Sequence, residues 1–235
     1  MLFKKMKSLK GIIILLVLIP LVFPTSSVLG YKYDRAKAAN WAARNALIKI
    51  PNDGIAERRC SSDCTCFASS SLYIGGWKKM SGWFWSANYW WKRSIIWPYQ
   101  SYAWAKSNYL STFIENRERG KKIKITASDL SKLVKLGLLK RGDIVQFTKT
   151  DEDTKQHSMV VTKVGKNGKN IKCKVECRTL NKKICENRGG KSPVCVSYHS
   201  ADVKNASLKK LMTKKDIGLT NKDFYLHHLY EYYSE

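Results

Sequence analysis

The first half of the chain places apolar residues with the period of a helix. In residues 33–50, Ala38, Trp41 and Ala42 fall on one face, and Asp34 can cap the start. Residues 63–76 predict a second helix, with Asp63 at the N-cap, small residues after it and two glycines at its end. Residues 101–116 predict a third helix that starts from Ser101.

The second half changes to the pattern of strands. After the turn at residues 141–143, β-branched or alternating runs predict strands at 144–147, 157–164, 171–177 and 194–200. The aromatic tail, residues 222–235, fits either a last strand or a docking helix. Helices followed by a meandering sheet indicate an α+β fold. No internal repeat, low-complexity segment or domain boundary is evident, so one domain is expected.

The N-terminal segment has the pattern of an export signal. Residues 1–10 carry four lysines and no acid, residues 11–24 are apolar or small, and Val28 and Gly30 suit a cleavage site. An uncleaved anchor is the alternative, but a span needs about 20 apolar residues and Pro20 interrupts this one. We therefore expect a signal peptide at 1–30 and a mature domain at 31–235. The protein is expected to be secreted, extracellular or in the cell wall, and to meet the membrane only during export.

The net charge of the chain limits the kinds of binding partner that we expect. It has 43 basic and 18 acidic residues, a formal net charge of +25, or +21 once the four leader lysines are subtracted. Outside a cell such an excess favours an anionic partner, for example wall polymers, a membrane surface or released nucleic acid. The alternative interpretation is that the basic residues only form a solvated surface and bind no specific partner. The lysines are scattered and no nucleic-acid motif is present, so a nucleic-acid partner is not expected.

A cluster of three cysteines marks the start of the second predicted helix. A thiol attacks only as the thiolate, so a nucleophilic cysteine needs a lowered pKa. The first helical turn lowers it through its unbonded N–H groups and the helix dipole, and the same N–H groups could bind an oxyanion. Cys64, directly after Asp63, occupies that place and is the candidate nucleophile.

The chain has four histidines from which a base for this thiol could come. His157 opens one predicted strand and His199 closes another, while His227 and His228 lie in the aromatic tail. Two histidines at the ends of neighbouring strands, facing a helix that starts with a cysteine, would form a Cys-His-His group. The spacing alone does not bring them together.

Seven segments of the chain carry a resemblance to a known family. They are "YDRAKAANWAARNA", "DCTCFASSSLYIGGWKKM", "YWWK" with "SYAWAKSNYLSTFI", "LKRGDIVQF", "HSMVVTKV" and "VSYHSADV". In this order, from about Tyr33 to Leu208, they resemble the secreted "putative amidase domain" family of Gram-positive bacteria. That family is a branch of the papain-like cysteine hydrolases related to CHAP-type and NlpC-type wall enzymes.

The resemblance implies a fold and a set of roles. The fold would be a papain-like α+β core with N-terminal helices and a small antiparallel sheet. Cys64 would be the nucleophile and His157 the general base. His199 would orient the base, with Asp202 as the alternative, and Asp63 would cap the helix without acting chemically.

The chain departs from the family motif at Cys66, where the family usually has asparagine. Two residues along a helix is about 200° around its axis, so Cys66 should not share the face of Cys64. This favours a structural role for Cys66, with Cys60 as its possible disulfide partner.

Four further cysteines lie in a segment at about 171–195, an insertion between the two histidine strands. They are Cys173, Cys177, Cys185 and Cys195. Outside the cytoplasm an even set predicts disulfides. The nested pairs Cys173–Cys195 and Cys177–Cys185 suit a hairpin, although four cysteines allow three pairings. A zinc site is the alternative, but its paired knuckle spacing is missing. No metal and no cofactor are expected.

Seven of the eight tryptophans fall between residues 77 and 104. Trp83, Trp85 and Trp97 are candidates for stacking on substrate, while Trp90, Trp91 and Trp104 suit packing against the core.

The export signal, the charge, the cysteine and histidine pattern and the family resemblance together predict a function. The protein is expected to be a monomeric secreted cysteine hydrolase that cleaves amide bonds of peptidoglycan through a thioester, as an endopeptidase or an amidase. The alternatives are an acyl transferase on the same site and a non-catalytic, basic and tryptophan-rich protein that binds the cell wall.

Overall fold

The computed structural model of the 235-residue chain describes residues 30–48, 63–92, 100–149, 155–213 and 222–233. The predicted signal peptide, apart from Gly30, lies outside the described residues, as do Cys60 and Trp97. Among the described helices, none has the length and apolar character needed to cross a membrane.

Four helices precede the sheet, in the places that the sequence predicts. α1 begins after Asp34, whose side chain accepts a hydrogen bond from the Lys37 N–H, so the predicted cap is confirmed. The third predicted helix is two helices, because Lys106 adopts extended backbone angles (φ −115°, ψ 129°) between them. Ser101 caps the first of these two, as expected. The helices are α1 (Arg35–Asn45), α2 (Asp63–Ile74), α3 (Tyr102–Ala105) and α4 (Ser107–Asn116).

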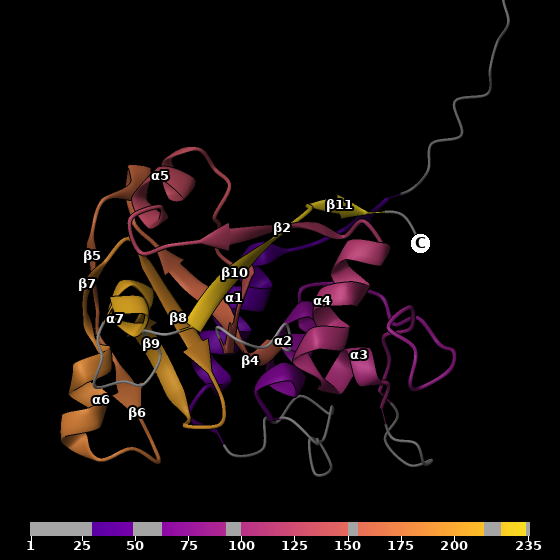
Figure 1. The fold of residues 1–235 in the computed structure, drawn as a ribbon, viewed down its shortest axis with the longest axis horizontal. Coiled ribbons are helices and arrows are strands. Elements are labelled where there is room, and N and C mark those ends of the chain that lie inside the picture. The colour runs from indigo at the N-terminus through magenta and orange to yellow at the C-terminus, as the bar shows by residue number, and fades with distance from the viewer. Residues whose placement is uncertain (1–29, 49–62, 93–99, 150–154, 214–221, 234–235) are drawn as a thin grey trace, which may run out of the picture.

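A seven-stranded antiparallel sheet forms the second layer, in the order β2-β10-β3-β4-β8-β9-β6 (Figure 1). The predicted strands at 144–147, 157–164 and 194–200 correspond to β3, β4 and β8. The strands are β2 (Gly120–Ile125), β3 (Ile144–Lys149), β4 (Lys155–Val164), β6 (Glu176–Cys177), β8 (Val194–Tyr198), β9 (Val203–Ser207) and β10 (Lys222–Leu229). This architecture confirms the predicted α+β class.

The aromatic tail is a strand inside this sheet and not a docking helix. β10 pairs on one side with β2 and on the other with β3, so that Leu226 lies opposite both Ile123 and Val145. The chain then closes with β11 (Tyr232–Tyr233), which pairs with β1 (Tyr31–Lys32) near the start of the domain (Figure 1). Both ends of the domain are therefore joined by backbone hydrogen bonds.

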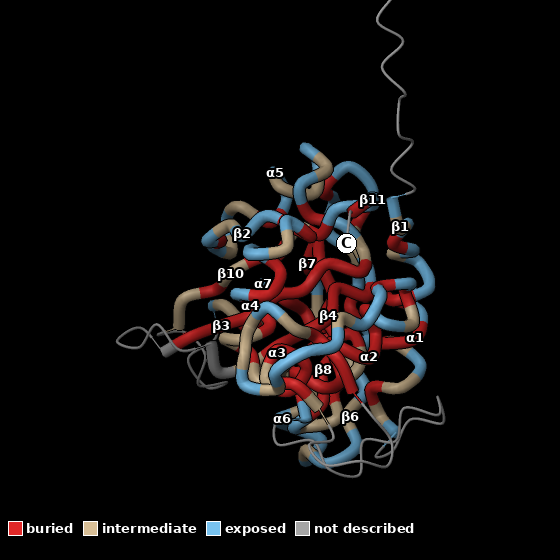
Figure 2. The backbone as a smooth tube through the Cα atoms, turned by 90° about the vertical axis from the view of Figure 1, so that its right-hand side faces the viewer, coloured by how far each residue is buried: buried red, intermediate tan, exposed pale blue. Residues whose placement is uncertain are grey.

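The sheet separates two apolar cores. One core lies between α1–α4 and residues such as Ile144 and Val160, and it contains Trp77, Trp90 and Trp104. The other core contains the neighbouring sheet residues Val145 and Val161 together with residues of α5 (Leu130–Lys135) and α7 (Leu208–Thr213). Successive residues of a strand point to opposite faces, which explains the division. In Figure 2 the trace along β4 and β8 is coloured mostly as buried, as expected for strands with a core on each face.

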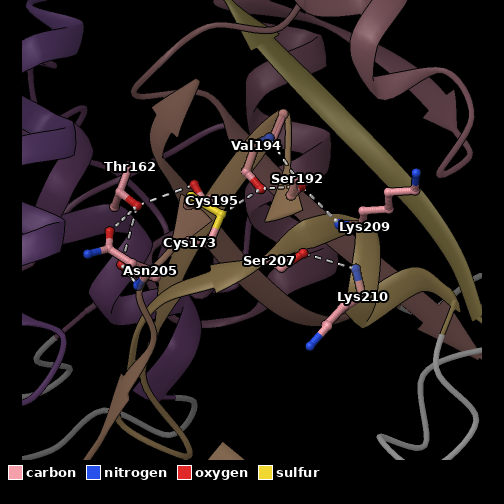
Figure 3. The surroundings of a disulfide bond; sticks show 10 residues. Thr162, Cys173, Ser192, Val194, Cys195, Asn205, Ser207, Lys209 and Lys210 are labelled. Atoms are coloured by element: carbon pink, nitrogen blue, oxygen red, sulfur yellow. Dashed lines mark hydrogen bonds between the residues drawn. A yellow bond between two sulfur atoms is a disulfide. The ribbon is translucent and has the colours of Figure 1, made fainter. Parts of the chain in front are cut away.

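The cysteine-rich segment is held by the nested disulfides that a hairpin favours. Cys173 is bonded to Cys195 and Cys177 to Cys185, which confirms this pairing and excludes these four thiols as zinc ligands. The segment contains β5 (Ile171–Cys173), α6 (Lys182–Arg188) and β7 (Gly190–Ser192), in addition to β6, and η1 (Lys166–Gly168) lies just before it. Beside the first disulfide, Thr162 Oγ1 donates to the Cys195 carbonyl at 3.2 Å and joins Asn205 Oδ1 at 3.0 Å (Figure 3).

Candidate functional site

The candidate thiol lies in the first turn of α2, a helix buried along most of its length. Small residues let α2 pack closely: Ser69 Oγ donates to the Trp104 carbonyl at 2.9 Å and accepts from Trp90 Nε1 at 3.1 Å. Cys64 is the second residue of the helix, is 3 % exposed and carries its sulfur as a thiol, not in a disulfide. The first N–H groups of a helix have no intrahelical carbonyl, so this is a place that favours a thiolate.

Cys66 differs from Cys64 in its bonding. It is fully buried and is disulfide-bonded. Cys60, the partner expected for it, lies outside the described residues. The structure therefore separates the two described cysteines of the cluster, because Cys64 alone keeps a thiol.

Asp63 is not the flanking N-cap that the sequence predicts. α2 begins at Asp63, so the carboxylate belongs to the first helical turn. Its Oδ1 lies 3.0 Å from His199 Nδ1, and it also accepts a hydrogen bond from the backbone N–H of Ser200. The carboxylate thus joins the start of α2 to the end of β8. Local capping patterns do not predict such a contact, because its two residues are far apart in the sequence.

His199 is buried and both of its ring nitrogens have partners. Nδ1 bonds Asp63, Nε2 lies 3.0 Å from the Asn45 carbonyl at the end of α1, and the ring stacks on Phe67 with centroids 4.3 Å apart. A carbonyl oxygen only accepts, so Nε2 must carry a proton. His199 therefore ties α1, α2 and β8 together at the thiol end of the helical layer.

His157 lies on β4, and its ring packs against two other aromatic rings. Ser158, the next residue, has its hydroxyl 3.3 Å from Thr65 Oγ1, directly after Cys64. The His157 ring lies against Phe147 (5.3 Å between centroids) and Tyr198 (5.0 Å). Among the described residues, no hydrogen bond joins this ring to Cys64 Sγ or to His199.

The charges of His199 and His157 both act to lower the pKa of Asp63. Burial of the carboxyl acts to raise its pKa, but four effects oppose it: the hydrogen bond from His199, the charge of His199, the Ser200 N–H and the charge of His157. Together they hold the pKa of Asp63 below its ordinary value. The structure thus brings Asp63, Cys64, His157 and His199 to one end of the helical layer.

Asp202, the other candidate for orienting the base, belongs to the same group. One ligand atom from each of Asp63, His199 and Asp202 lies within 4.8 Å of the others, a spacing that could hold a metal ion. A proton at His199 Nδ1 accounts for the close approach of the carboxylate, so we assign the group as an acid–imidazole cluster.

The tryptophans divide into packed and exposed sets. Trp90, Trp91 and Trp104 are buried, so the packing role expected for them is confirmed. Trp83 and Trp85 are 66 % and 51 % exposed, and their rings stack at 5.0 Å. Trp97, the third candidate for substrate contact, lies outside the described residues.

Two buried polar clusters are not predicted by the sequence, one beside the site and one at the opposite end of α1. One joins Thr65 to Ser107, Ser158 and Gln146, and the other surrounds Asp143. The available signal was polar residues within apolar strand segments, such as Gln146 between Val145 and Phe147. Such residues are buried only when partners satisfy them.

One comparison with known proteins finds a match, and it covers most of the chain. A family model described as "Putative amidase domain" matches residues 32–220, about four-fifths of the chain. No curated protein and no solved structure matches the chain.

Proposed function

Because the chain belongs to the "putative amidase domain" family, a membership that supports hydrolysis of an amide C–N bond, we propose a secreted cysteine hydrolase that cuts peptidoglycan. The observation that carries the proposal is the Cys64 thiol in the first turn of α2, beside an Asp–His pair. The relation to papain-like wall enzymes, including the CHAP and NlpC types, is part of the proposal.

The proposed reaction proceeds through a thioester. Cys64 Sγ attacks the carbonyl carbon of the amide while His157 takes the thiol proton. N–H groups at the start of α2 bind the oxyanion. The C–N bond then breaks, the amine leaves with the proton from His157, and water hydrolyses the thioester with His157 again as base.

For this step a nitrogen of the His157 ring, which packs against Phe147 and Tyr198, has to come within hydrogen-bond distance of the thiol. Catalytic hydrogen bonds are often long or unaligned before substrate binds, so the resting orientation does not disqualify it. His199 is already bonded to Asp63 and to the Asn45 carbonyl. We therefore propose that His199 acts by fixing Asp63 and the start of α2; direct orientation of His157 by His199 would require different hydrogen bonds.

The surface features fit a wall substrate. The net charge of the mature chain, +21 once the four leader lysines are subtracted, attracts anionic wall polymers. The exposed Trp83 and Trp85 offer apolar rings to a glycan or stem peptide. Their proposed roles are to hold the enzyme on the wall and to contact the substrate.

The test is release of new amino groups from purified peptidoglycan by the mature protein. Cys64→Ala should abolish release, because no other described cysteine keeps a thiol. His157→Gln should lower the rate by about 10²- to 10⁴-fold, the usual contribution of a general base. Ser71→Ala is the matched control, since it removes a buried hydroxyl of the same helix that bonds only the Ala68 carbonyl.

The other outcomes identify the alternatives. Unchanged release by Cys64→Ala contradicts the nucleophile. Strong sedimentation with walls but no release by the wild-type protein indicates a binding protein, and incorporation of an added amine into the product indicates an acyl transferase. Mass analysis of the released fragments identifies which amide bond is cut.

A further inference from the structure

A closed set of buried hydroxyl groups lies beside the Cys64 sulfur. Thr65 Oγ1 is 3.8 Å from Cys64 Sγ, 2.7 Å from Ser107 Oγ and 3.3 Å from Ser158 Oγ. Ser107 Oγ and Ser158 Oγ are 3.0 Å apart. Three hydroxyls from α2, α4 and β4 therefore form a triangle, and only Thr65 extends it to the thiol.

Gln146, on β3, donates a hydrogen bond to this triangle, and its side-chain amide has a fixed orientation. Its Nε2 lies 2.9 Å from the Ser107 carbonyl, which can only accept, so the nitrogen points there. The same nitrogen donates to Ser158 Oγ at 2.9 Å. Its Oε1 then faces His227 Nε2 at 2.9 Å and accepts a hydrogen bond from the N–H there. All these groups are buried.

The donor count determines what the triangle can do. Ser158 accepts from Gln146, and its second lone pair can still accept from another hydroxyl. The three hydroxyl protons can form a closed ring, in either direction, or a chain that begins at Ser107 or Ser158 and ends at Thr65. In the chain the Thr65 proton has one remaining acceptor among the described residues, Cys64 Sγ. A thiolate accepts hydrogen bonds and donates none, so its charge selects the chain.

We propose that Thr65 donates a hydrogen bond to the Cys64 thiolate, and that Ser107, Ser158 and Gln146 are positioning residues that polarise it. Hydrogen bonds to the charged form stabilise that form, and a buried chain of donors strengthens the last bond. Hydroxyl protons rotate without moving heavy atoms, so the network changes from ring to chain as the thiol ionises. The inference rests on the proposed function in giving Cys64 the attacking role.

The network also joins the nucleophile to the proposed base. Thr65 directly follows Cys64 and Ser158 directly follows His157. A hydroxyl contact between these neighbours fixes the start of α2 against β4. The same residues therefore stabilise the thiolate and set the distance between the two reacting elements.

The test measures the thiol without any substrate. The rate of alkylation of Cys64 by iodoacetamide is followed against pH, with the modified residue located by mass mapping. Thr65→Val keeps the shape of the side chain and removes the donor, so the midpoint of the profile should rise by about one pH unit, the effect of one hydrogen bond to a charged group. Thr65→Ser, which keeps the hydroxyl, should restore the wild-type midpoint.

A second variant keeps the inference falsifiable if Thr65→Val does not fold. Ser158→Ala leaves Thr65 in place but removes its support, so a smaller upward shift is expected, while Ser71→Ala should leave the midpoint unchanged. Equal midpoints for wild type, Thr65→Val and Ser158→Ala overturn the inference. The profile is independent of hydrolysis, so a shifted midpoint in a protein that releases no amino groups refutes the proposed function alone.

Discussion

The molecule contains two Asp–His pairs with almost the same geometry, one at each end of α1. At the end of α1, Asp63 and His199 are 3.0 Å apart, and His199 also bonds the Asn45 carbonyl. At its start, Asp143 and His228 are 3.1 Å apart, and Arg35 bonds the same carboxylate at 2.5 Å. The distances do not distinguish the pairs, but their burial and their neighbours do.

The Asp143 pair is a structural clamp. Its carboxylate is fully buried and accepts from Arg35, from the backbone N–H groups of Lys140 and Leu229, and from His228. Arg35 also donates to the Leu229 carbonyl. These contacts join α1, β3 and β10, and the carboxylate has no face open to a substrate.

The Asp63 pair has the opposite distribution of burial. Here the imidazole is buried and the carboxylate side chain is 48 % exposed, next to a thiol in the same helical turn. An acid–imidazole pair is therefore not by itself a catalytic signal. What marks a candidate site is the pair together with a nucleophile and access from solvent.

The largest expected difference between the pairs is in stability. Asp143→Asn removes the charge that compensates the nearly buried Arg35, and breaking a buried pair in this way should lower the free energy of unfolding by about 3 kcal/mol or more. Chemical denaturation of the two proteins measures the loss. An Asp143→Asn protein as stable as wild type would remove the distinction between clamp and site.

The matched substitution at the other pair should cost little stability. Asp63→Asn removes a half-exposed charge, so the free energy of unfolding should fall by less than about 1 kcal/mol. Release of amino groups from peptidoglycan should fall more strongly, because the start of α2 loses its charged link to His199. A large loss of stability with full activity would show that Asp63 is a structural clamp like Asp143 and not part of the site.

The smallest expected effect is a dependence of stability on acid. The native pKa of Asp63 is below its ordinary value, because the hydrogen bond and charge of His199, the Ser200 N–H and the charge of His157 outweigh burial. Its contribution is therefore complete above the ordinary aspartate pKa of about 3.9 and is lost as the pH falls through the native value. Melting temperatures between pH 6 and pH 2.5 should fall less steeply in Asp63→Asn than in wild type. Parallel curves would show that the pair adds no acid-sensitive stability.

The sequence predicted those features that depend on neighbours along the chain. The caps at Asp34 and Ser101, the strand around His157 and the nested disulfides follow from local patterns, and all are present in the structure. It also indicated Cys64 as the thiol of interest, since the helix start is itself a local feature. The tail was undetermined, because its aromatic pattern suits a strand or a helix equally.

What the tertiary structure alone decided is which distant residues meet. Asp63 is bonded to His199 across 136 residues, and Gln146 to His227 across 81, because strand order brings their elements together. A strand pattern fixes which face a residue occupies, but not which strand lies beside it. The sequence by itself determined the chemical groups and their local placement, and the sheet determined which carboxylate clamps the fold and which lies beside the thiol.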